Sequence, residues 1–144
     1  MYEKTTRNIR VTVRPKYLQS QSRPDDDHFV WAYTITIENR GIETVTLRSR
    51  HWKITDDRGR LQEVRGDGVV GEQPTLKPGE SFDYTSGVPL STPSGFMVGT
   101  YQMESAGGER FDIDIPAFSL DIDPPSLLRD SPQDRKSTRL NSSH

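Results

Sequence analysis

The sequence predicts an all-β fold, an antiparallel sandwich or barrel of about seven short strands. Two observations carry this prediction. Apolar residues recur with a period of two rather than the 3.6 of a helix. Turns rich in Gly and Pro separate nearly all of these runs, and the 144 residues include 11 Gly and 10 Pro. A chain of this length is most simply one domain.

The N-terminal half shows the alternation first in segment 9–13 and most clearly in segment 29–38. In the latter, one face collects Trp31, Tyr33, Ile35 and Ile37, and the other collects Ala32, Thr34, Thr36 and Glu38. Segments 45–47 and 52–54 continue the pattern. Such β-branched and aromatic residues suit a half-buried pleated surface.

The C-terminal half repeats the pattern in segments 82–84, 96–103 and 111–115. In the last of these, apolar residues alternate with Asp112 and Asp114, so a solvent-facing role is expected for these carboxylates and for Asp121 and Asp123. The intervening turns lie at 39–41, 56–59, 77–79, 92–95 and 107–108. Gly supplies positive φ there, and Pro presets φ.

Two polar segments depart from this pattern. Residues 14–27 contain two prolines and are predicted to form a long connecting loop. Residues 125–144 are rich in Ser, Pro and charge, and we expect a disordered tail after a domain spanning 1–124. The tail ends in RKSTRLNSSH, which resembles a translated sequencing-adapter artefact, so this end is given no functional weight.

Composition excludes several classes of protein. Without Cys there is no disulfide, iron–sulfur cluster, thiolate zinc site or cysteine nucleophile. The net charge of −2 argues against a partner made of nucleic acid. No apolar run approaches the ~20 residues of a membrane helix, and the N-terminus lacks a signal peptide. The prediction is a cytoplasmic protein with no membrane association.

A glycine-rich motif offers a candidate binding loop, made of Arg65, Gly66, Gly68 and Gly71. Its spacing is G-x-G-x-x-G, which binds a pyrophosphate when it joins a strand to a helix. Here residues 72–79 contain two prolines and cannot continue as a helix. Two interpretations remain: a backbone nest for an anion beside Arg65, or a structural loop with tight geometry.

An acidic cluster at Asp25, Asp26, Asp27 and His28 offers ligands that Mg²⁺ or Co²⁺ would accept. Consecutive loop residues rarely converge on one ion, however, so a solvated turn is the alternative and the prediction includes no metal ligand. We also predict no cofactor.

A third candidate is Ser49-Arg50-His51-Trp52. Ser49 and His51 would share a face of a strand, but there is no nucleophile elbow, and the sequence places no Asp or Glu to orient the imidazole. We therefore predict Trp52 in the core and His51 on the opposite face. Arg50 and His51 become a candidate interaction surface, and no catalytic residue is predicted.

The chain contains four long motifs: SRHWKITD at 49–56, EVRGDGVVGEQPTLKPGESFDYTSG at 63–87, TPSGFMVGTYQM at 92–103 and RFDIDIPAFSL at 110–120. In this order they resemble the motifs of the ApaG family. The resemblance covers about residues 2–124. It implies an immunoglobulin-like or fibronectin type III-like β-sandwich, a homodimer, and an association with cobalt resistance and magnesium efflux. The same domain in F-box proteins and in a polymerase-delta-interacting protein resembles a protein-interaction module.

The predicted function is therefore that of a non-enzymatic binding module, acting in divalent-cation homeostasis through contacts with an unknown protein partner. The alternative is a direct binder of a small ligand, either a pyrophosphate-containing nucleotide or a divalent metal ion.

Overall fold

The computed structural model describes residues 1–122. Two 3₁₀ turns, η1 (Gln19–Gln21) and η2 (Pro24–Asp26), accompany nine strands in this part of the chain. The strands are β1 (Tyr2–Thr6), β2 (Ile9–Tyr17), β3 (Phe29–Asn39), β4 (Val45–Asp56), β5 (Leu61–Asp67), β6 (Thr75–Leu76), β7 (Ser81–Leu90), β8 (Ser94–Ser105) and β9 (Arg110–Asp121). None of the helical segments within residues 1–122 is long and apolar enough to cross a membrane.

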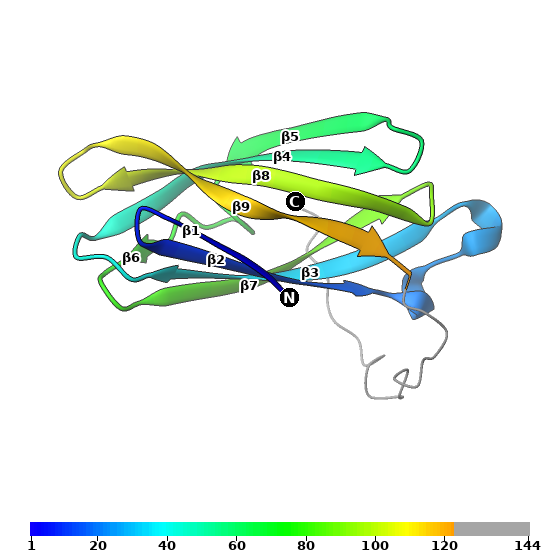
Figure 1. Ribbon diagram of the computed structural model, residues 1–144, viewed down its shortest axis with the longest axis horizontal. Helices are drawn as coiled ribbons and strands as arrows, with labels where there is room; N and C mark the ends of the chain where they lie inside the picture. Colours follow the sequence, from blue (N-terminus) through cyan, green and yellow to red (C-terminus); the bar gives the residue numbers. More distant parts are fainter. Residues whose placement is uncertain (123–144) are drawn as a thin grey trace.

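The strands form two antiparallel sheets that pack face to face, which confirms the predicted β-sandwich (Figure 1). A four-stranded sheet has the order β1-β2-β3-β7. A five-stranded sheet has the order β5-β4-β8-β9, and β6 also pairs with β4. Strand β9 lies beside β1 and β2, so the two sheets approach each other there, while β5 and β7 end the sheets on the opposite side.

The core lies between the sheets and contains the apolar faces that the alternation predicts. Trp31, Tyr33, Ile35 and Ile37 of β3 are all buried. They meet residues of the other sheet in aromatic contacts, such as Tyr33 with Trp52 edge-on and Tyr33 with Phe118 at a tilt. The predicted position of Trp52 in the core is confirmed, because its side chain is fully buried.

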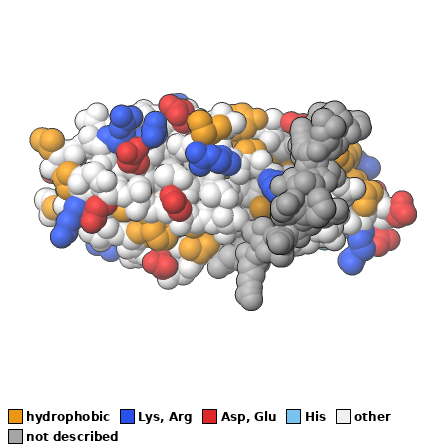
Figure 2. Space-filling model, turned by 90° about the horizontal axis from the view of Figure 1, so that it is seen from below, with side chains coloured by type: hydrophobic (Ala, Val, Ile, Leu, Met, Phe, Trp, Pro, Cys, Tyr) orange, Lys and Arg blue, Asp and Glu red, His pale blue; other side chains and the backbone are white. Residues whose placement is uncertain are grey.

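The outer faces carry the polar positions. On β9, Asp112 and Asp121 are exposed and Asp114 is partly exposed, as the alternation predicts, while Asp123 lies outside the described residues. Figure 2 views the molecule from the side of the four-stranded sheet, where charged side chains of both signs are scattered. Thr34 and Thr85 also lie on this sheet, with their hydroxyls 2.8 Å apart.

The described residues form more strands than the predicted seven, because some strands form by pairing with a neighbour although their own sequence lacks apolar alternation. Strand β1 is mostly polar, yet its whole length pairs with β2. Strand β5 exposes most of its residues and is held by β4. Strand β6 has two residues.

The predicted loop at 14–27 begins too early, because β2 continues to Tyr17 through Pro15. Pairing of β1 with β2 ends at Tyr2 and Val13, so Pro15 lies on a free edge of β2. Proline is tolerated at such an edge because no ladder hydrogen bond needs its missing N–H. The predicted tail at 125–144 lies outside the described residues.

Candidate functional site

The two candidate surfaces that the sequence suggested lie together at one corner of the five-stranded sheet. Antiparallel pairing of β4 with β5 sets Arg50 opposite Gly66 and His51 opposite Arg65. These four residues line one open depression of about 520 Å³. Their proximity follows from the β4–β5 hairpin, a feature that sequence reasoning missed because β5 has little apolar alternation.

A β-bulge in β4 decides where the side chains at this corner point. The register between β4 and β8 shifts between Leu47 and Ser49. Arg50 then pairs with the buried Tyr101, so Arg50 faces the interior together with Trp52. His51 faces outward, as predicted.

The guanidinium of Arg50 is hydrogen-bonded to the start of the turn that follows β5. Its Nη1 donates hydrogen bonds to the backbone oxygens of Asp67 at 3.0 Å and Gly68 at 2.9 Å. The guanidinium also lies against Gly66, where an added Cβ would be 2.8 Å from Nη1. A side chain at position 66 would therefore force the end of the Arg50 side chain to shift.

The other two glycines of the motif serve the backbone. Gly68 has φ of 62°, and an added Cβ would lie 2.2 Å from the carbonyl oxygen of Glu72. Val69 and Glu72 exchange two backbone hydrogen bonds, of 2.8 and 2.9 Å. Between them, Val70 and Gly71 both have positive φ, as in a type I′ hairpin turn. No helix follows the motif, as the two prolines predicted, and the chain continues to β6.

Several backbone N–H groups of this loop already donate hydrogen bonds to backbone oxygens of the protein. Gly68 N donates to Arg48 O at 2.8 Å, and those of Val69 and Glu72 donate within the turn. A phosphate cradle requires several loop N–H groups that point at one anion. The geometry therefore favours a structural role for the glycines over an anion nest.

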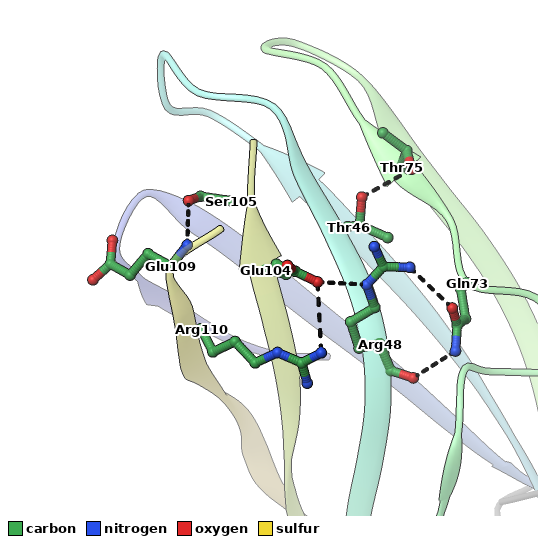
Figure 3. A network of polar contacts seen from close by, with 8 residues as sticks. All are labelled: Thr46, Arg48, Gln73, Thr75, Glu104, Ser105, Glu109 and Arg110. Atoms are coloured by element: carbon green, nitrogen blue, oxygen red, sulfur yellow. Dashed lines mark hydrogen bonds and ion pairs between the residues drawn. The ribbon is translucent and has the colours of Figure 1, made fainter. Parts of the chain in front are cut away.

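A polar network holds the loop against the sheet (Figure 3). Arg48 Nε donates to Glu104 at 2.8 Å, and its Nη1 donates to Gln73 at 3.1 Å. Gln73 in turn donates to the Arg48 carbonyl, and Arg110 lies 3.7 Å from Glu104. The hydrogen bond from Arg48 lowers the pKa of Glu104. Sequence reasoning missed this network because its members are far apart along the chain.

The outward side chain of His51 has an acidic partner. Its Nε2 lies 2.8 Å from Oε2 of Glu63, and this contact is the main reason that the pKa of Glu63 is lowered. The prediction that no acidic residue orients His51 is therefore wrong, because the hairpin register brings Glu63 next to it. Ser49 donates its hydroxyl hydrogen to Gln102 at 2.8 Å, so it is engaged away from the imidazole.

The acidic cluster lies far from this corner. Asp25 and Asp26 belong to η2, and Asp27 adopts a left-handed conformation before His28 bridges back to Arg23. The segment is thus a surface turn. Within residues 1–122, His, Asp and Glu form no group of three or more that could hold a metal ion.

A family model described as the ApaG domain matches residues 19–105. The chain belongs to the ApaG family. A protein named ApaG from Rhodospirillum centenum is 67% identical over 121 residues, which cover 84% of this chain and 93% of that relative. The ApaG protein of Parvibaculum lavamentivorans is 64% identical over the same shares.

Solved structures extend this likeness to three dimensions. A crystal structure from Bordetella pertussis, of a protein assigned as ApaA, superposes with a TM-score of 0.78 at 49% identity. It covers 79% of this chain and 93% of its own. The C-terminal domain of Wzt has a TM-score of 0.53 at 7% identity and shares the fold alone. The ApaG sandwich is thus the fold of this chain.

Proposed function

We propose that this ApaG-family chain is a non-enzymatic binding module of the cytoplasm that acts through protein contacts. In line with the family resemblance, its place is in divalent-cation homeostasis, with cobalt resistance and magnesium efflux as the processes affected. We include a homodimer in the proposal, and the free backbone edge of β5 gives a second copy a surface with which to pair.

The observation that carries the proposal is the composition of the outer face of the five-stranded sheet. His51 and Arg65 lie on this face, and the exposed apolar side chains of Leu61 and Phe96 lie farther along the same strands. Basic and aromatic groups of this kind, presented on a rigid sheet, are typical of protein contact surfaces. The network around Arg48 fixes the adjoining loop, so the surface is preorganised for binding.

A direct binder of small ligands is the second candidate. What favours it is the open depression that Arg65 and His51 line, since Arg65 is exposed and lies 3.7 Å from Glu63 rather than in a close pair. Such a site would select an anion such as pyrophosphate, ATP or GTP. A divalent metal ion is the other ligand under this candidate, although within residues 1–122 no three His, Asp or Glu side chains are grouped so that they could hold one.

One pair of measurements separates the two candidates. Affinity capture of the full chain from the cells that make it should yield a specific protein partner. Thermal unfolding with ATP, GTP, pyrophosphate, Mg²⁺ or Co²⁺ should then show no stabilisation, because only a ligand that binds the folded state raises its stability. Stabilisation by one of these ligands without any captured partner would support the direct binder instead.

A further inference from the structure

A second depression lies on the same outer face, on the other side of His51. We name it the lysine groove and define it by Lys4, Lys53, Val98 and Ala117. Its lining comes from β1, β4, β8 and β9, and its volume is about 330 Å³. It is separate from the glycine-rich corner, although His51 borders both.

The floor of the lysine groove is apolar because of a second bulge. The register of β8 with β9 passes from Met97 opposite Phe118 to Gly99 opposite Ile115. Val98 therefore faces both Pro116 and Ala117, and Ala117 is exposed. The apolar surface continues along the same face to Phe96, which is 48% exposed, and across Thr55 to Leu61, which is 57% exposed.

The walls carry more positive than negative charge. Lys4 pairs with Asp114 at 3.1 Å, and both side chains remain about half exposed. Lys53 faces Glu63 across the hairpin, but that carboxylate also contacts His51 at 2.8 Å and Arg65 at 3.7 Å. Among the residues that line the groove, Lys4 and Lys53 are accompanied by the single carboxylate of Asp114, so one positive charge remains in excess even when His51 is neutral.

From this combination we propose that the lysine groove docks an acidic segment of a partner protein. The segment is extended, with an aliphatic side chain on the floor at Val98 and Ala117 and carboxylates beside Lys53 and Lys4. The apolar contact supplies affinity, and the charges select acidic over basic segments. This inference rests on the proposed function and names the contact surface for it.

The test uses a short synthetic peptide with a central Leu flanked by Glu on both sides. Matched peptides replace the Glu residues with Gln or with Lys. Amide chemical shifts of the full chain, recorded by NMR, should move around Lys53, Val98 and Ala117 with the Glu peptide. Binding should weaken with added salt, because exposed charges are screened. The Lys peptide should cause no shift in the groove.

The variant Lys53→Glu should bind the Glu peptide roughly tenfold more weakly, since an attractive exposed pair becomes repulsive. Lys77→Glu is the matched control, because Lys77 is also exposed but lies in the turn before β7, outside the groove. Shifts that fall elsewhere, equal binding of the Glu and Lys peptides, or equal binding by both variants would overturn the proposal.

These experiments distinguish failure of the groove proposal from failure of the proposed binding-module function. If native partner capture persists unchanged in Lys53→Glu and the peptide does not bind, the groove proposal fails and the module stands. If the wild-type chain captures no specific partner, the binding-module function is rejected, whether or not the peptide binds.

Discussion

The glycine-rich corner and the lysine groove lie on one sheet and both contain basic side chains, yet they use them differently. At the corner, Arg48 and Arg50 donate to a carboxylate, an amide oxygen and two backbone carbonyls. In the groove, Lys53 is exposed and Lys4 is about half exposed. Arg48 and Arg50 are therefore part of the framework, whereas Lys53 and Lys4 belong to surface that a partner can reach. Residue type alone does not distinguish the two roles.

The largest expected effect tests whether the corner is framework. Gly68→Ala should destabilise the fold by about 3 kcal/mol or more, because it adds both left-handed strain and a backbone clash with Glu72. Chemical unfolding followed by tryptophan fluorescence measures this. The matched control is Gly59→Ala, also at positive φ but with no atom within 4 Å of the added Cβ, which should cost about 1 kcal/mol. Equal losses would show that the close approach at Gly68 does not matter.

The next largest effect should be a difference between Arg50 and Arg65 in how much each contributes to the free energy of unfolding. Arg50→Met should cost about 2 kcal/mol, because it leaves the carbonyls of Asp67 and Gly68 without their donor. Arg65→Met, at a side chain that is 72% exposed, should change the free energy of unfolding by less than about 0.5 kcal/mol. Similar losses in both variants, measured by urea denaturation, would contradict the division between framework and surface.

A smaller effect should depend on pH. The hydrogen bond from Arg48 lowers the pKa of Glu104 in the folded state. This contribution to stability is present above the unfolded pKa of a glutamate, near ~4.3, and is lost as the pH falls through the folded value. Glu104→Gln should therefore be less stable than wild type at neutral pH, with the difference shrinking in acid. A difference that stayed constant across this range would mean that the Arg48 interaction does not depend on the charge of Glu104.

The smallest expected effect on stability belongs to the groove. Lys53→Met should alter the free energy of unfolding by less than about 0.5 kcal/mol, because the side chain is exposed and its charge is solvated. A thermal unfolding curve checks this. A marked destabilisation would place Lys53 in the framework and remove the contrast with the corner.

The sequence was sufficient for the sandwich class, for the buried face of β3 and for Trp52, because these depend on a period of two with large apolar residues. It was not sufficient for β1 and β5, whose strand form comes from a neighbour and not from their own apolar content. The bulge at Arg48 also escaped prediction, and it is this bulge that lets Arg50 face inward and His51 outward.

The candidate site shows the same division. Arg50, His51, Arg65 and the glycines could be chosen by type and spacing, but their grouping required the hairpin register. Glu63 and Glu104 escaped notice because each acquires its partner only through strand pairing. Lys4 and Ala117 could not have been associated, since they come from opposite ends of the chain and meet where β9 lies beside β1.

The most direct test of the binding-module function is quantitative affinity capture by the full chain in its native cells, with wild type, Lys53→Glu and Lys77→Glu compared side by side. We predict one specific protein partner, retained by wild type and by Lys77→Glu and reduced about tenfold with Lys53→Glu. Capture of no specific partner by the wild-type chain would contradict the proposed function.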